Sequence, residues 1–343
     1  MSRRPSDYDE SDVRIRPSRR GSRPRSKDRP GHEDAVPARV VGVDRGRYTT
    51  LLDEGEPGER TVVAMKAREL GRKGIVVGDL VGLVGDLRGG PDSLARVVRV
   101  HPRTSVLRRT ADDSDPVERI IVANADQLVI VTALANPEPR PRMIDRCLVA
   151  AYDAGMDPLL LLTKADLVDP GPFLQRYAPL EVPTLATAAS PDGDLDPKGI
   201  AELTDALRGR TSVLVGHSGV GKSTVVNLLV PDAGRATGQV NDVTGRGRHT
   251  STSAVALRLP GRDGWVIDTP GVRSFGLAHV DPTSIVDHFP DLAPGTGQCP
   301  RGCTHDEPEC ALDDWVASGK AGPTGAERLV SLRLLLRSRA ESD

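Results

Sequence analysis

The segment Gly216–Ser223 reads GHSGVGKS and has the spacing G-x-x-x-x-G-K-S of a phosphate-binding loop. Its glycines let backbone N–H groups converge on phosphate oxygens, and a helix that starts at the loop adds a dipole that favours anions. We expect Lys222 to contact the β- and γ-phosphates and the Ser223 hydroxyl to bind Mg²⁺. The predicted phosphate-side contacts of a nucleotide are Gly216, His217, Ser218, Gly219, Val220, Gly221, Lys222, Ser223 and Thr224.

A second motif, Thr163-Lys164-Ala165-Asp166, comes earlier in the chain and indicates which base is bound. Guanine presents two N–H donors on one edge, and a single carboxylate accepts both, whereas adenine presents a lone pair there. Asp166 is therefore predicted to read guanine, with the stem of Lys164 along the base plane. Thr163 stands where Asn is usual in this motif. The motif predicts GTP binding and argues against an ATPase or kinase that carries the same phosphate loop.

Two segments after the phosphate loop are predicted to complete a Mg²⁺ site. The glycine-rich segment TGRGRHTSTSA offers hydroxyl ligands, and we expect Thr250 to sense the γ-phosphate, with Ser251 as the near alternative. Asp268 ends the apolar segment WVID and is predicted to be the outer Mg²⁺ carboxylate. Ser223, Thr250 and Asp268 therefore form the expected Mg²⁺ set, and Gly271 is placed to offer its N–H to the γ-phosphate.

Val272 occupies the position after D-x-x-G at which many regulatory GTPases carry a water-orienting Gln. Since valine cannot orient water, intrinsic hydrolysis should be slow unless another group serves. That group is either His249, next to Thr250, or one supplied by a partner. The predicted catalytic residues are Lys222, His249, Thr250 and Asp268.

The segment CPRGCTHDEPEC near the end of the chain holds Cys299, Cys303, His305 and Cys310. Three thiolates and one imidazole form a complete tetrahedral zinc set with no position left for a substrate, which predicts one structural zinc ion. Free thiols beside an exposed histidine are the alternative. Cys147 lies alone in an apolar helical segment and is predicted to be a buried structural thiol.

The elements that must position these motifs follow from residue periodicity. Five short apolar or alternating segments (38–43, 48–52, 60–65, 79–85, 94–100) predict a small antiparallel barrel, either an OB-fold that binds RNA or a barrel that only packs. Residues 101–109 read as a linker. Beyond them, apolar strands alternate with helices, which is typical of a parallel sheet covered by helices.

The prediction is thus a multidomain fold. A disordered basic arm spans 1–35, an OB-fold barrel 36–104, an α/β P-loop GTPase domain 105–279, and a zinc-binding α-helical domain 280–343.

Charge is unevenly distributed along the 343 residues, although the formal net charge is only -2. Residues 13–30 carry eight Arg or Lys against one acid, which predicts an arm that contacts RNA or, alternatively, only aids solubility. The sequence has no apolar run of about twenty residues and no signal core at its start, so we expect a soluble, cytoplasmic protein without membrane contact. Nothing demands more than a monomer.

The order TKAD, GHSGVGKST, GRGRHTST, DTPG resembles that of the RsgA (YjeQ) family of circularly permuted GTPases. The resemblance implies an OB-fold, a permuted GTPase domain and a C-terminal zinc domain. It also implies a Mg-dependent GTP hydrolase that assists late maturation of the small (30S) ribosomal subunit, contacts 16S rRNA and is stimulated by the subunit. The family is described as lacking the usual Gln, in agreement with Val272. The zinc motif here, C-x₃-C-x-H-x₄-C, is tighter than the family's C-x₄-C-x-H-x₅-C.

A permuted order is compatible with one nucleotide site, because the loops only need to meet at the carboxyl ends of parallel strands. It also leads the chain from Asp268 directly into the C-terminal domain, which suggests that nucleotide state is passed to that domain. A GTP-gated RNA-binding module with incidental hydrolysis remains the alternative function.

Overall fold

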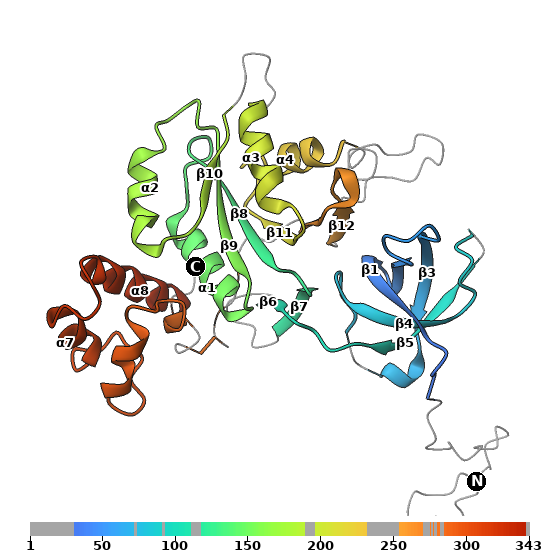
Figure 1. Ribbon diagram of the computed structural model, residues 1–343, viewed down its shortest axis with the longest axis horizontal. Coiled ribbons are helices and arrows are strands. Elements are labelled where there is room, and N and C mark those ends of the chain that lie inside the picture. Colours follow the sequence, from blue (N-terminus) through green and yellow to red (C-terminus); the bar gives the residue numbers. More distant parts are fainter. Residues whose placement is uncertain are drawn as a thin grey trace, which may run out of the picture. The chain divides into compact units, whose positions relative to one another are not determined.

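The computed structural model describes residues 31–71, 74–90, 93–110, 118–188, 196–231, 254–269, 275, 277, 280–281 and 285–340 (Figure 1). Residues 34–343 form one compact unit. The basic segment 13–30 and the residues His249, Thr250, Gly271 and Val272 lie outside the described residues.

The first five strands form a closed barrel, as predicted. They are β1 (Val36–Asp44), β2 (Arg47–Leu52), β3 (Arg60–Lys66), β4 (Leu80–Gly85) and β5 (Ala95–Val100), with the short helix η3 (Arg68–Leu70) after β3. The ring closes in the order β1-β2-β3-β5-β4-β1, in which only the β3–β5 pair is parallel. Inward residues at every second position, such as Val62 and Ala64, build the barrel core. This is the five-stranded topology of an OB-fold.

The prediction of a linker over 101–109 is wrong from residue 106 onward. Strand β6 (Val106–Thr110) pairs antiparallel with β7 (Glu118–Ala123) in a separate two-stranded sheet. Leu107 is fully buried. Burial of this apolar side chain favours a strand here, although two arginines follow it directly.

The β6–β7 sheet also contacts the barrel through the turn before β4. Gly78 has φ +89°, and a Cβ there would lie 1.9 Å from the carbonyl oxygen of Ala123, so only glycine fits. The fully buried Asp79 next to it receives two hydrogen bonds from Arg103, at 2.6 and 2.8 Å. The buried charge is therefore paired, as burial requires.

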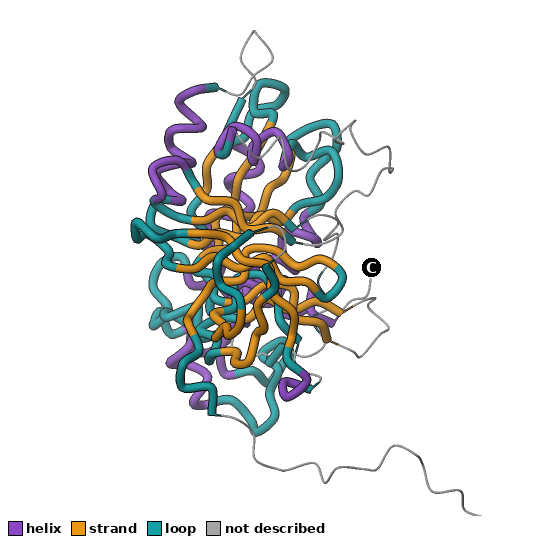
Figure 2. The backbone as a smooth tube through the Cα atoms, turned by 90° about the vertical axis from the view of Figure 1, so that its right-hand side faces the viewer, coloured by secondary structure: helices purple, strands orange, loops and turns teal. Residues whose placement is uncertain are grey.

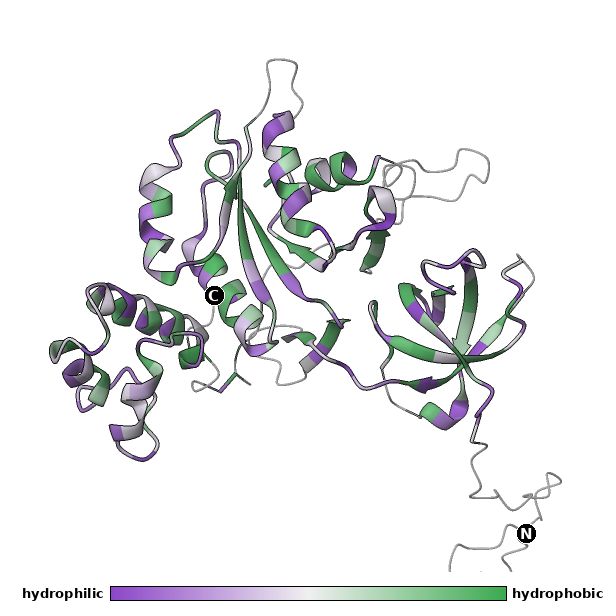
Figure 3. Cartoon of the chain, in the orientation of Figure 1, coloured by the Kyte–Doolittle hydropathy of each residue, from purple (hydrophilic) through white to green (hydrophobic). Residues whose placement is uncertain are grey.

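A second group of strands forms the predicted parallel sheet. It contains β8 (Gln127–Ala133), β9 (Asp157–Thr163), β10 (Thr184–Ala186), β11 (Thr211–Val215) and β13 (Trp265–Asp268), with β12 (Val255–Arg258) antiparallel to β13. The strand order is β10-β9-β8-β11-β13-β12, and β12 continues to barrel strand β1 through the pair Gly42–Val255. Figure 3 shows β8 and β9 as largely hydrophobic, which fits strands buried on both faces.

Helices cover both faces of this sheet (Figures 1 and 2). Helices α1 (Pro141–Asp153) and α2 (Gly171–Tyr177), followed by η4 (Ala178–Leu180), lie on one side, and α3 (Pro197–Leu207) and α4 (Lys222–Leu229) on the other. Along β8, Leu128 and Ile130 belong to the core shared with α1, and Val129 and Val131 to the core shared with α3 and α4. Each strand therefore supplies two cores with alternate residues.

One carboxyl group is buried between α1 and α2. Burial raises the pKa of Asp145 to about 6, although the charge of Arg176 and a hydrogen bond with Tyr177 act in the opposite direction. The fold therefore favours the protonated carboxyl up to about pH 6, whereas a free aspartate loses its proton at about pH 4.

The C-terminal region comprises η7 (Ala293–Gln298), α7 (Ala311–Ala317) and α8 (Gly325–Ala340), while η6 (Pro260–Arg262) lies in the turn between β12 and β13. Helix α8 packs on α1 and anchors itself through the buried Arg328. That guanidinium binds Asp291 Oδ2 at 2.7 Å and the carbonyl of Pro179 at 2.8 Å. Within the described residues, no helix is both long and apolar enough to span a bilayer.

Candidate functional site

The nucleotide motifs meet at one edge of the parallel sheet. Each of them directly follows the carboxyl end of a strand or ends one: TKAD at β9, the phosphate loop after β11, and Asp268 at β13. The ladder places these strand ends side by side, with the pairs Ala133–Thr163, Ile130–Val215 and Leu214–Asp268. The inverted order in the sequence therefore does not separate the motifs in space.

The phosphate loop joins β11 to α4 and depends on its glycines. Gly221 caps α4 with φ +88°, a conformation that favours glycine. A Cβ at Gly216 would lie only 2.6 Å from the carbonyl oxygen of Val131 on β8. The loop can thus run close to the neighbouring strand and present the first turn of α4, with the exposed Ser223 and Thr224, at the sheet edge.

The guanine motif is hydrogen-bonded to the phosphate loop. The buried Thr163 Oγ1 donates to the carbonyl of Val220 at 2.6 Å. Lys164 Nζ donates to the carbonyl of Gly219 at 3.1 Å and also to that of Asn136, in the loop after β8. Two motif residues therefore fix the position of the phosphate loop relative to the base-reading loop.

Asp166 is exposed at the end of this motif, where its carboxylate can meet a base from solvent. The preceding residue, Ala165, donates its N–H to the carbonyl of Thr187 at 3.1 Å. Thr187 is buried and begins the TAAS segment, of which residues 189 and 190 lie outside the described residues. The loop that carries Asp166 is thus supported from both neighbouring strand ends.

Lys222 and Asp268 contact each other directly at the phosphate side of the edge. Their side chains are only 12% and 15% exposed, so the pair is largely shielded from solvent. The chain just after Asp268 is fixed by Thr269 Oγ1, which donates to the carbonyl of Leu214 at 2.7 Å. An ammonium and a carboxylate here can bind a phosphate and a divalent cation, respectively.

His217 is a buried polar side chain of the phosphate loop. Its Nδ1 lies 3.0 Å from the carbonyl oxygen of Ser218, so that nitrogen carries the proton. Its Nε2 is buried and has no hydrogen-bond partner within the described part of the chain.

The four predicted zinc ligands lie together, with their donor atoms all within 4.8 Å of one another. Cys299 Sγ is 3.9 Å from Cys310 Sγ and 3.5 Å from His305 Nδ1. Zinc–sulfur bonds of about 2.3 Å in a tetrahedron put two sulfurs about 3.8 Å apart, so the cluster fits zinc. The sulfurs are too far apart for a disulfide, and all four cysteines are free. Burial lowers the pKa of His305, which favours the neutral imidazole that a metal needs.

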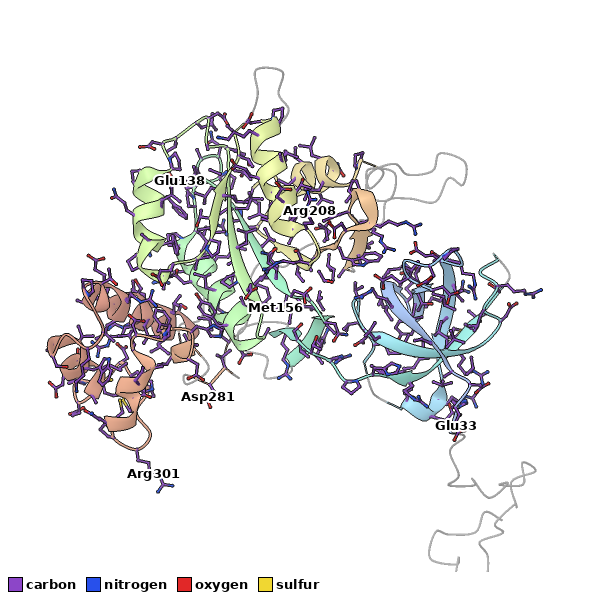
Figure 4. All side chains as sticks on the ribbon, in the orientation of Figure 1. Glu33, Glu138, Met156, Arg208, Asp281 and Arg301 are labelled. Atoms are coloured by element: carbon purple, nitrogen blue, oxygen red, sulfur yellow. The ribbon has the colours of Figure 1, made fainter. Side chains whose placement is uncertain are left out.

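Helix α8 and a local carboxylate hold the ligand loop in place. Glu307 accepts hydrogen bonds from the Thr304 backbone N–H at 3.0 Å and from its hydroxyl at 2.7 Å. Arg333 donates to the carbonyl of His305 at 3.1 Å, and Arg337 forms a bidentate pair with Asp306 at 2.8 Å. Arg301, labelled in Figure 4, projects away from this loop. The final helix therefore packs on the cysteine module.

Comparison with known proteins identifies the family. The model of the family described as RsgA GTPase matches residues 100–278. A protein from Pseudomonas putida named small ribosomal subunit biogenesis GTPase RsgA is 41% identical over 262 residues, covering 74% of this chain and 73% of the relative. The chain belongs to the RsgA GTPase family. A Gemmatimonas aurantiaca relative of the same name is 35% identical over 298 residues, covering 83% of this chain and 93% of its own.

Two solved structures share the RsgA fold of this chain. YjeQ from Thermotoga maritima has a TM-score of 0.62 at 24% identity, covering 90% of this chain and 99% of its own. YloQ, described as a circularly permuted GTPase, has a TM-score of 0.61 at 20% identity, covering 92% and 100%. These likenesses confirm the predicted permuted GTPase fold with its N-terminal barrel.

The structure brings together most of the RsgA motif residues predicted from sequence. TKAD, the phosphate loop and Asp268 share one edge, whereas His249 and Thr250 lie outside the described residues. Sequence reasoning missed Asn136, whose carbonyl holds Lys164. A signal existed, since Asn-Pro directly follows an apolar strand and marks a turn at the same edge of the sheet.

Proposed function

We propose that this chain hydrolyses GTP with Mg²⁺ and assists late maturation of the small (30S) ribosomal subunit, which stimulates hydrolysis. Membership of the RsgA GTPase family and the names of its curated relatives support the biological role. The observation that carries the chemistry is the meeting of Lys222, Asp268 and the TKAD motif at one sheet edge.

Each residue has a separate proposed part in the reaction. Asp166 accepts the two N–H donors of guanine, and Lys222 neutralises charge on the β- and γ-phosphates. Ser223 and Asp268 would hold Mg²⁺, together with Thr250. The ion would neutralise charge that develops between the phosphates. Because Lys222 and Asp268 contact each other, both side chains would exchange partners when nucleotide and Mg²⁺ bind.

The group that orients the attacking water is proposed from sequence alone. Val272 cannot do so, and His249 is adjacent to the proposed switch residue Thr250. We propose His249 for this part, unless the ribosomal subunit supplies the group. The variant His249→Ala decides between these: it abolishes stimulated turnover in the first case and leaves it intact in the second.

The remaining parts are proposed as contacts with 16S rRNA or ribosomal proteins. They are the barrel, the basic arm and the C-terminal module, whose Cys299, Cys303, His305 and Cys310 would hold one structural zinc ion. An assembly factor of this kind would act as a monomer in the cytoplasm.

The decisive experiment is the rate of GTP turnover with and without purified small subunits. We expect marked stimulation in the wild type and none in Lys222→Ala, which loses the phosphate contact. Tight GTP-dependent binding to subunits without stimulated turnover would instead establish a gated RNA-binding module. ATP that displaced bound GDP would contradict the role of Asp166.

A further inference from the structure

Side chains of the barrel bind the hairpin formed by β12 and β13 through hydrogen bonds and ion pairs. Trp265, the first residue of β13, is 8% exposed, and its indole Nε1 donates a 2.8 Å hydrogen bond to Glu54 Oε1. Glu54 follows barrel strand β2, and its other oxygen accepts from Arg39 Nε on β1 at 2.7 Å. One carboxylate thus joins the barrel to β13. We call Arg39, Glu54, Glu59, Arg258 and Trp265 the barrel clasp.

A second carboxylate of the barrel clasp holds the other strand of the hairpin. Glu59 Oε2 accepts from Arg258 on β12 at 2.6 Å, and the two side chains are only 15% and 19% exposed. The guanidinium carbon of Arg258 lies 5.1 Å from the centre of the Trp265 ring, and that of Arg39 lies 5.9 Å from it. Partial burial and ring contacts make these pairs stronger than isolated surface ion pairs.

The barrel also reaches the opposite end of the hairpin. Gly42 of barrel strand β1 pairs with Val255 of β12, and Val255 pairs in turn with Asp268 of β13. The ladder therefore runs from the barrel directly to the residue that contacts Lys222 at the nucleotide site.

Trp265 and Asp268 stand at the two ends of a four-residue strand. At about 3.3 Å per residue they are only about 10 Å apart along the chain, too short a distance for the strand to absorb a shift. A displacement of the clasped end thus moves the carboxylate, and metal coordination tolerates only a few tenths of an ångström.

We propose that Glu54 is a positioning residue of the nucleotide site, because it holds Trp265 and so determines where Asp268 stands. The inference rests on the proposed function, in which Asp268 is the outer carboxylate of the Mg²⁺ site. The barrel is then a part of the GTPase apparatus in addition to any contact with RNA.

The test compares full-length variants by two readouts that do not depend on turnover. The first is the Kd for a fluorescent GDP analogue, measured with and without Mg²⁺. The ratio of the two Kd values reports on the metal site. The second is hydrogen exchange of a peptide that covers residues 254–268 without nucleotide. The variants are Glu54→Ala, Glu54→Gln, Trp265→Phe and the double variant Glu54→Ala/Trp265→Phe. Asp53→Asn is the control, because Asp53 is adjacent in the same loop but pairs at the surface with Arg60 of barrel strand β3.

We expect Glu54→Ala to reduce the Mg²⁺-dependent gain in GDP affinity roughly fivefold or more and to speed exchange in 254–268, since a buried donor loses its acceptor. Glu54→Gln keeps an oxygen for the indole N–H and should retain most of the gain. Asp53→Asn should match the wild type. The double variant should be no worse than the worse single variant, because Glu54 acts through Trp265.

Three results would overturn the proposal: an unchanged Mg²⁺ dependence in Glu54→Ala, additive losses in the double variant, or equal losses in Asp53→Asn. If Glu54→Ala does not fold, Trp265→Phe takes its place as the variant that must lose Mg²⁺ dependence. Glu54→Gln remains the variant that should retain it. Asp268→Asn separates this inference from the proposed function. If Asp268→Asn leaves the Mg²⁺ dependence of GDP affinity unchanged, the role of Asp268 itself is overturned. If Asp268→Asn changes that dependence but Glu54→Ala does not, only the positioning role of Glu54 is overturned.

Discussion

Removing the hydrogen bond from Thr163 to the phosphate loop tests how the two nucleotide motifs cooperate. The substitution Thr163→Val keeps the side-chain shape but removes the hydroxyl that donates to the Val220 carbonyl at 2.6 Å. Thr163 is 2% exposed, so water cannot readily replace the lost donor. Leaving such an acceptor without its partner costs about 1–3 kcal/mol.

If that cost falls on the nucleotide-binding conformation of the loop, the Kd for GDP should rise about 5- to 150-fold. The measurement is a fluorescence titration with a labelled GDP, accompanied by thermal unfolding to confirm that the variant is folded. Thr163→Ser is the matched control, because it keeps the hydroxyl and should bind within a few-fold of the wild type. Wild-type affinity in Thr163→Val, or an equal loss in Thr163→Ser, would refute the reasoning.

Three further predictions concern other sites. Asp166→Asn should weaken GDP binding about 10- to 150-fold and improve binding of the xanthine analogue, because an amide can donate to the added carbonyl of xanthine. Competition titration measures both affinities, and an unchanged preference for guanine would contradict the role of Asp166. Chelation should release about one zinc ion per chain and unfold the module around Cys310 while GDP still binds. Metal analysis and hydrogen exchange measure these two effects, and slow hydrogen exchange in the metal-free module would count against a structural ion. The pKa of Asp145 is raised to about 6, so its contribution to stability is complete below about pH 4 and is lost as pH rises through 6. Asp145→Asn should therefore be more stable than the wild type by about 2–3 kcal/mol at pH 7.5 but not at pH 4 in urea unfolding, and an equal difference at both pH values would exclude this origin.

The strands and the motif loops could be predicted because their signals are local. Apolar runs bounded by glycine and proline located the barrel strands to within about two residues of their observed bounds. The ligands of the cysteine cluster were readable from residue type and spacing alone. The short strand β6 was missed because two arginines follow its apolar pair, and a strand of five residues offers little periodicity.

Contacts between distant segments carried no such signal. The hydrogen bond between Glu54 and Trp265 joins residues 211 positions apart, and nothing in either neighbourhood indicates its partner. For Lys164, the Asn-Pro pair marks a turn at the same sheet edge, but nothing local indicates that the Asn136 carbonyl is the acceptor, since a backbone acceptor has no residue identity. Family resemblance supplies the arrangement of domains, but individual tertiary pairs require coordinates.

The position of β13 inside the sheet has a consequence for synthesis on the ribosome. This strand lies between β11 and β12 and carries Asp268, yet it leaves the ribosomal tunnel long after the base-reading loop at β9. A nascent chain that ends before β13 can already pair β9, β8 and β11, which hold the TKAD motif and the phosphate loop together, but it lacks Asp268 and its contact with Lys222. The proposed Mg²⁺ site, and with it full stabilisation by nucleotide, would therefore be acquired only when most of the polypeptide has been made.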